Sequence, residues 1–201
     1  MNYLIIVVLS YFLGSIPFSY IVPKVFGKID IRSVGSGNTG TTNVVRTLGL
    51  KIGAIAFLGD FLKGVVPALI GLNFIGFYGG LIGGGLAVLG HCFPVWLKFK
   101  GGKGIATSAG GLIVIFPMIT IILLIWQFGL IFITKYMSLA SITSAVLFPL
   151  LVFFFNYDTV TLMYSILLGG FVIYRHRANL QRLLSGTEKK LTVAKGKTAK
   201  P

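Results

Sequence analysis

The stretch of this sequence best suited to chemistry is the polar, glycine-rich run at residues 35–43, Gly-Ser-Gly-Asn-Thr-Gly-Thr-Thr-Asn. It offers hydroxyls, amides and little side-chain bulk in a chain that is 55% hydrophobic. Glycine lets the main chain approach a ligand closely, and residues 44–48 are predicted to continue as a short helix. A helix N-terminus attracts anions, and Arg46 adds a charge that can pair with phosphate. We predict a phosphate-binding segment here, with a flexible linker as the alternative.

A second glycine-rich segment, Gly101-Gly102-Lys103-Gly104, places bare backbone amides beside one ammonium group. The segment is not a Walker A loop, because no serine or threonine follows the lysine and the upstream glycine spacing differs. It has the features of a phosphate cradle, but for so short a motif taken alone an ordinary turn is the favoured interpretation.

The third polar group lies near the C-terminus. His176 and Asn179 are three residues apart, so they are predicted to share one face of the last helix. A lone histidine is more often a structural residue at an interface, and a place in the site is the alternative. The neighbouring arginines are most simply membrane-surface cations. Ser141 begins another apolar segment and either binds a ligand or serves as helix-packing glue.

The composition places these groups in a membrane protein. Only 11% of the 201 residues are charged and the mean hydropathy is +0.92, whereas a soluble domain has about 25% charged residues. The net charge of +14 indicates basic cytoplasmic loops and an anionic ligand. No soluble basic domain is present to bind nucleic acid. The single cysteine, Cys92, excludes an intramolecular disulfide, and the scattered histidines and carboxylates predict neither a metal site nor a cofactor.

The apolar segments predict an all-α polytopic protein with about seven transmembrane helices, some of them short or broken. They cover residues 2–22, 52–73, 77–97, 105–134, 137–155 and 159–174. The fourth segment is either one span or two spans that turn at Phe116-Pro117. Only two spans bring every basic loop to one face, as the positive-inside bias requires. We therefore predict an outside N-terminus and a cytoplasmic C-terminus.

The remaining expectations concern individual spans. The first is a retained span, because it lacks a basic leader and a clear cleavage site, and Pro17 is expected to kink it. Asp60 and Lys63 are expected to form a structural ion pair, with a part in chemistry as the alternative. We expect a single domain at residues 1–188, followed by a basic, disordered tail at 189–201.

Two classes of function fit these features. One is an enzyme that uses a phosphorylated substrate at the cytoplasmic membrane surface, and the other is a transporter of a small anionic solute with broken helices. A transporter should hold its polar groups near the bilayer midplane. Here they cluster at one end of the predicted bundle, which favours the enzyme.

Taken in order, these motifs resemble the acyl-phosphate:glycerol-3-phosphate acyltransferases of the PlsY family. The resemblance runs from about Gly14 to Glu188. The residues that carry it are Asp30-Ile31-Arg32, Gly35-Ser36-Gly37-Asn38, Thr42-Asn43, Arg46, His91-Cys92-Phe93-Pro94-Val95, Lys98 to Gly104, Ser138-Leu139-Ala140-Ser141, Arg175-His176, Asn179, Arg182 and Glu188.

The resemblance implies transfer of a fatty acyl group from acyl phosphate to the 1-hydroxyl of sn-glycerol 3-phosphate without a metal cofactor. The products are lysophosphatidic acid and inorganic phosphate, in phospholipid biosynthesis at the bacterial inner membrane. The implied catalytic residues are Lys103, His176, Asn179 and Ser36. The implied substrate-binding residues are Gly37, Asn38, Thr39, Gly40, Thr41, Thr42, Asn43, Arg46, Gly101, Gly102, Gly104 and Ser141. His91 and Glu188 are expected to be structural supports.

The resemblance leaves the proton acceptor open. Either His176 or a phosphate oxygen of the substrate takes the hydroxyl proton, and we favour the substrate. We expect the protein to act as a monomer in the bilayer, with its active site facing the cytoplasm.

Overall fold

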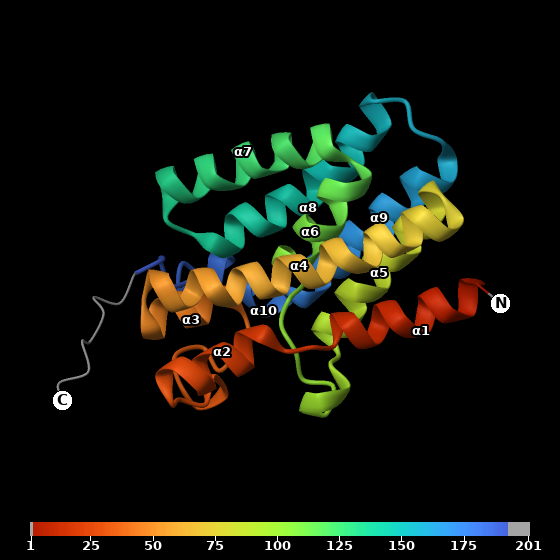
Figure 1. Cartoon of the computed structure of the whole chain (residues 1–201). Coiled ribbons are helices and arrows are strands. Elements are labelled where there is room, and N and C mark those ends of the chain that lie inside the picture. Colours follow the sequence, from red (N-terminus) through yellow and green to blue (C-terminus); the bar gives the residue numbers. More distant parts are fainter. Residues whose placement is uncertain (1, 193–201) are drawn as a thin grey trace. The chain divides into compact units, whose positions relative to one another are not determined.

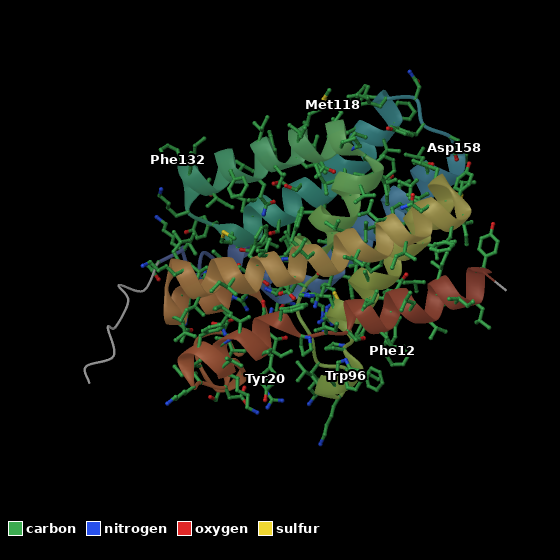
Figure 2. All side chains as sticks on the ribbon, viewed as in Figure 1. Phe12, Tyr20, Trp96, Met118, Phe132 and Asp158 are labelled. Atoms are coloured by element: carbon green, nitrogen blue, oxygen red, sulfur yellow. The ribbon has the colours of Figure 1, made fainter. Side chains whose placement is uncertain are left out.

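The fold is described from a computed structural model, which describes residues 2–192 (Figure 1). These residues form helices and connecting loops that divide into two compact units. Among the described residues, unit 1 covers the chain up to Ile115 together with Thr192, and unit 2 covers Phe116–Leu191. The predicted all-α membrane fold is confirmed. Residues 193–201 of the predicted tail lie outside the described part of the chain.

Unit 1 is built on a long central helix, α4, which packs against α1, α2, α3, α5 and α6. Figure 1 shows α1, α4 and α5 running side by side. The elements of unit 1 are α1 Asn2–Gly14, α2 Phe18–Gly27, the 3-10 turn η1 Ile31–Ser33, α3 Thr41–Leu48, α4 Leu50–Ile75, α5 Phe77–Cys92, the 3-10 turn η2 Val95–Leu97 and α6 Ile105–Ile115. The first glycine-rich segment therefore lies between η1 and α3, and the second between η2 and α6.

The side chains of unit 1 are distributed as expected for a membrane protein. Asp60 and Lys63 are buried between helices, with exposed fractions of 0% and 5%, whereas large apolar side chains such as Leu4, Leu58 and Phe74 are exposed. Apolar side chains can face lipid tails, whereas a polar group inside a span must face the bundle interior. This arrangement supports insertion of unit 1 in a bilayer.

Close helix packing in unit 1 depends on glycine. A Cβ atom built on Gly71 of α4 would overlap the carbonyl oxygen of Gly79 of α5, so the two backbones are in contact. A separate apolar cluster, made by Val22, Ile31 and Val44 with Ala56, packs α2, η1 and α3 against α4. Two residues of that cluster, Ile31 and Val44, lie on either side of the first glycine-rich segment in the sequence.

Unit 2 consists of three apolar helices and a short terminal helix. Its elements are α7 Pro117–Thr134, α8 Met137–Phe154, α9 Thr159–Arg175 and α10 Arg177–Leu184. Helix α8 packs against α7 and α9, and α10 contacts α8 and α9. In Figure 1, α7 and α8 lie side by side and are joined by a short turn. That turn contains Lys135 with a φ of 62°.

The predicted interruptions of the apolar segments occur at proline residues. Helix α1 ends at Gly14 and α2 begins at Phe18, because Pro17 has no N–H to continue the helical ladder. The apolar run 105–134 is likewise two helices, and α7 begins at Pro117. Helix α6 has 11 residues, or about 17 Å at about 1.5 Å per residue. It packs against α4 and α5.

Five stretches within residues 2–192 are long and apolar enough to cross a membrane, counting Tyr3–Gly27 as one. Two shorter apolar helices, α6 and α9, complete a set of seven apolar segments among the described residues. The helical segments therefore match the predicted ones. The number of spans and the orientation of the termini stay predictions.

Candidate functional site

The first glycine-rich segment is organised around the buried side chain of Asn43, which is 2% exposed. Its Nδ2 donates to the carbonyl oxygens of Ile31, Val34 and Asn38 at 3.1, 3.0 and 3.2 Å. Its Oδ1 accepts the backbone N–H of Ser36 at 3.0 Å. A predicted substrate-binding residue thus has all its polar atoms engaged with the loop backbone. In this structure Asn43 shapes the loop, and its contact with substrate stays a prediction.

Two glycines allow the loop to close around Asn43. Gly35 and Gly37 have φ values of +64° and +69°, which favour glycine. A Cβ atom on Gly35 would also overlap Oδ1 of Asn43. The loop consequently leaves Ser36 exposed at its tip, where its hydroxyl is accessible to a ligand.

Helix α3 begins at Thr41, directly after the loop, as predicted. The first amides of an α-helix have no intrahelical acceptor. Within residues 2–192, Oδ1 of Asn38 and Oγ1 of Thr41 are buried atoms that lack a hydrogen-bond partner. The amide of an asparagine can flip and present its NH2 group. Two buried polar atoms beside a helix N-terminus are suited to a polar ligand, and Arg46 lies half-buried on the second turn of the same helix.

The second glycine-rich segment folds back on the end of α5. The backbone N–H groups of Gly101 and Gly102 donate to the carbonyl oxygens of Cys92 and His91 at 3.1 and 3.2 Å. A Cβ atom on Gly102 would overlap Nε2 of His91 and would lie 2.9 Å from the carbonyl oxygen of Thr39. Unit 1 therefore brings the two glycine-rich segments into contact, although they are about 60 residues apart in the sequence.

The lysine of this loop lies between two tightly placed glycines. Gly102 is buried, Lys103 is half-buried, and Gly104 has a φ of +92°. Helix α6 begins at Ile105, and the N–H of Ser108 donates to the carbonyl oxygen of Gly104 at 2.7 Å. The backbone on both sides of Lys103 is thus fixed, which limits where its ammonium can reach.

An exposed ion pair marks the start of the first loop. Nη2 of Arg32 lies 2.6 Å from Oδ2 of Asp30, and the guanidinium lies over the ring of Tyr20 at 4.8 Å. Hydrogen bonds from the Arg32 side chain and backbone hold the pKa of Asp30 at about 2. Asp30 therefore stays charged throughout the physiological range and keeps Arg32 at the base of the loop.

In unit 2, His176 lies at a helix junction, which corrects the prediction that it shares one continuous helix with Asn179. Helix α9 ends at Arg175 and α10 begins at Arg177. With a φ of −97° and a ψ of 5°, His176 turns the chain between them. The i, i+3 spacing therefore runs across a corner, and the two residues stay together because the N–H of Asn179 donates to the carbonyl oxygen of His176 at 2.8 Å.

The His176 ring has a defined tautomer. Its Nδ1 lies 2.8 Å from the carbonyl oxygen of Val172, and a carbonyl oxygen only accepts. Nδ1 consequently carries the hydrogen, and in the neutral ring Nε2 holds the lone pair. That arrangement equips Nε2 to accept a proton or a hydrogen bond.

Asn179 donates one side-chain N–H to Oε1 of Glu188 at 2.8 Å, and Ser138 of α8 donates to the same oxygen at 2.8 Å. Nε of Arg182 donates to Oε2 at 2.7 Å. Burial alone would raise the pKa of Glu188, but the hydrogen bonds from Asn179, Ser138 and Arg182 bring it below its ordinary value. The predicted supporting role of Glu188 matches these contacts. Sequence analysis missed Ser138 as a partner, because fifty residues separate it from the carboxylate.

The pKa of Glu188 has a consequence for stability. Because the folded pKa is lowered, the carboxylate stabilises the fold above its unfolded pKa of about 4.3, and this contribution is lost as pH falls through the folded value. Glu188→Ala leaves three donors without their acceptor and should cost roughly 2–3 kcal/mol at pH 7. The difference in Tm between wild type and Glu188→Gln, followed by thermal scanning in detergent, should shrink below about pH 4. A Tm difference that stays constant with pH would contradict a stabilising role for the ionised Glu188 carboxylate.

Ser141 is buried on α8, one turn beyond Ser138. Its hydroxyl donates to the carbonyl oxygen of Met137 at 2.8 Å and accepts from Nε2 of Gln127 at 3.4 Å. Both contacts are typical of a packing serine. The ligand role of Ser141 stays a prediction.

The structure therefore sorts the predicted residues into two groups. The first, in unit 1, contains Ser36, Gly37, Asn38, Thr39, Gly40, Thr41, Thr42, Asn43, Arg46, Gly101, Gly102, Lys103 and Gly104. The second, in unit 2, contains Ser141, His176 and Asn179.

The fold and the loops together define a polytopic helical membrane protein with backbone segments suited to binding phosphate. Comparison with known proteins gives the particular class. The chain belongs to the glycerol-3-phosphate acyltransferase family, whose model matches residues 4–186.

Individual relatives agree with this assignment. The glycerol-3-phosphate acyltransferase of Thermoanaerobacter pseudethanolicus is 47% identical over 92% of this chain and 93% of its own length. The glycerol-3-phosphate acyltransferase of Bacillus subtilis is 44% identical over 93% of this chain and 96% of its own length. The crystal structure of PlsY, an integral membrane glycerol 3-phosphate acyltransferase, in its glycerol 3-phosphate form has a TM-score of 0.90 at 41% identity and covers 96% of each chain. Its lysophosphatidic acid form has a TM-score of 0.88 at 40% identity, covering 94% of this chain and 95% of that chain.

Proposed function

We propose that this protein transfers a fatty acyl group from acyl phosphate to the 1-hydroxyl of sn-glycerol 3-phosphate. The hydroxyl oxygen attacks the acyl carbon, the bond from that carbon to the phosphate oxygen breaks, and lysophosphatidic acid and inorganic phosphate are released. Family membership and the two solved forms of PlsY support the acceptor and the product. A transporter of an anionic solute gains no support from this family.

The observation that carries the proposal is the contact between Gly102 and the carbonyl oxygen of Thr39. It places two amide-rich segments side by side in unit 1, and the reaction requires recognition of two phosphoryl groups. We assign the phosphate of acyl phosphate to the segment Ser36 to Asn43 with Arg46. Lys103 and its loop are assigned to glycerol 3-phosphate, together with Ser141, His176 and Asn179.

Phosphate leaves a mixed anhydride readily, so the protein needs to activate the leaving group only weakly. Its larger task is to position the two substrates. Holding both reactants in register can supply about 7–11 kcal/mol of the barrier. Each donor placed at the developing oxyanion adds about 2.7–4 kcal/mol. The proposed donors are Lys103, Asn179 and the amides after Asn38.

The proton of the attacking hydroxyl goes to a phosphate oxygen of the substrate in our preferred scheme. Under it, His176→Ala should raise the KM for glycerol 3-phosphate and lower kcat by less than about a hundredfold. A general base contributes about 10²–10⁴-fold. Steady-state kinetics with saturating acyl phosphate tests this. A variant that keeps a normal KM but loses about a thousandfold in kcat would make Nε2 of His176 the base.

We also propose that the protein works as a monomer in the bacterial inner membrane, with the active site facing the cytoplasm. The lopsided distribution of loop cations supports this orientation. The deciding experiment for the function is an assay of purified protein with acyl phosphate and glycerol 3-phosphate. Phosphate release should depend on both substrates. Release without glycerol 3-phosphate, or none with both present, would overturn the proposal.

A further inference from the structure

The polar network inside the helices of unit 1 is larger than the predicted Asp60–Lys63 pair. Nζ of Lys63 lies 2.9 Å from Oδ1 of Asp60, and Ser19 of α2 donates its hydroxyl hydrogen to Oδ2. On the third side, Nδ1 of His91 lies 3.5 Å from Oδ1. Lys63 also donates to the carbonyl oxygen of Ile16 at 2.7 Å. Asp60 is thus a hub that joins α2, α4 and α5 at one point.

Charge compensation alone does not explain this hub. Replacing a buried ion pair by apolar side chains of similar volume is often neutral or stabilising. Ionisable groups inside a span are costly and most often serve a function. The feature that sets this pair apart is its third partner, since neither Asp60 nor Lys63 needs His91 for neutrality.

His91 connects the hub to the second glycine-rich loop. Its Nδ1 faces Asp60, whereas its Nε2 occupies the space that a Cβ atom of Gly102 would take. Its backbone oxygen accepts the N–H of Gly102 at 3.2 Å. One imidazole ring therefore lies between the carboxylate and the loop, so the orientation of the ring determines its contact with the backbone next to Lys103.

We propose that Asp60 is a positioning residue for acyl transfer, which fixes the His91 ring and through it the Gly101–Gly104 loop. This inference rests on the proposed function, because it assigns the loop to glycerol 3-phosphate. Asp60 is fully buried between the helices, so no contact with substrate is assigned to it. Its effect should therefore fall on the acceptor and leave acyl phosphate recognition largely unchanged.

Two double variants with the same net charge separate positioning from charge balance. Asp60→Asn with Lys63→Met removes both charges but keeps an oxygen opposite Nδ1 of His91. Asp60→Leu with Lys63→Met removes that oxygen as well. Both should fold, with Tm values within a few degrees of wild type. The Leu variant should raise the KM for glycerol 3-phosphate at least about tenfold relative to the Asn variant, while the KM for acyl phosphate stays within about twofold.

Hydrogen exchange provides a readout that needs no activity. The amides of Gly101 and Gly102 donate to Cys92 and His91, so a loosened loop should exchange faster in the Leu variant than in the Asn variant. Equal KM values and equal exchange in the two variants would overturn the inference. If the Leu variant does not fold, the test passes to His91→Leu, which leaves the Asp60–Lys63 ion pair intact. This variant must show the same rise in the KM for glycerol 3-phosphate and the same faster exchange. Wild-type values of both would overturn the inference. A wild-type protein that fails the two-substrate assay would refute the proposed function, while the exchange comparison would still test the positioning.

Discussion

Asn43→Asp is expected to reduce phosphate release to less than about 1% of wild type. The substitution is isosteric, but it exchanges the donating NH2 group for a carboxylate oxygen. That oxygen would face the carbonyl oxygens of Ile31, Val34 and Asn38 at 3.0–3.2 Å. The carboxylate would keep only one donor, the backbone N–H of Ser36. A buried charge so poorly compensated costs several kcal/mol, so the loop must open or the aspartate must be protonated. Both outcomes destroy the geometry beside the start of α3, and kcat/KM measured with both substrates detects the loss.

Two comparisons show whether the loss comes from the loop. Asn43→Ala removes the three donated hydrogen bonds and the one accepted from Ser36, but it adds neither an acceptor nor a charge, so its loss should be smaller than that of Asn43→Asp. Asn73→Asp makes the same change at an exposed site on α4, where Nδ2 donates only to the carbonyl oxygen of Leu69 at 2.8 Å. Its activity and Tm should stay close to wild type. An Asn43→Asp variant as active as Asn73→Asp would show that the loop does not depend on this amide.

Most of the helical architecture could be predicted from hydropathy, because in a bilayer every backbone group must be satisfied within its own segment. Runs of apolar residues therefore coincide with helices. Prolines at positions 17 and 117 mark breaks for a local reason, their missing N–H groups. The corner at His176 carries no such signal. Neither glycine nor proline occurs there, and His176 is buried at the corner with its ring hydrogen-bonded to the carbonyl oxygen of Val172.

The candidate site was predictable as a set of segments and less so as a set of contacts. Glycines, hydroxyls and amides between apolar runs mark where a ligand can reach the backbone. The sequence does not show that the Asn43 side chain hydrogen-bonds to the loop backbone, because its partners lie up to twelve residues upstream. It also cannot show that His91 lies between Asp60 and Gly102. Their spacing follows no helical or strand period, and only the packing of α4 against α5 brings them together.

Gly102→Ala is expected to lower kcat/KM for glycerol 3-phosphate at least about a hundredfold. The added methyl group would overlap Nε2 of His91 and would lie 2.9 Å from the carbonyl oxygen of Thr39. Neither neighbour can yield easily. The His91 ring is 6% exposed and lies against Asp60, and the Thr39 oxygen belongs to a buried backbone. The loop itself must therefore move, and a displacement of about 1 Å near reacting groups can cost about a hundredfold in rate.

The matched control for this substitution is Gly129→Ala on α7, where a Cβ atom would meet no atom within 4 Å. Alanine is the better helix former by about 1 kcal/mol, so this variant should keep full activity and an equal or higher Tm. Gly102→Ala should instead lose activity with only a modest fall in Tm, because the strain is confined to one loop. Wild-type kinetics in Gly102→Ala would mean that the two glycine-rich segments can separate without cost, and the contact on which the proposed function depends would then have no role in catalysis.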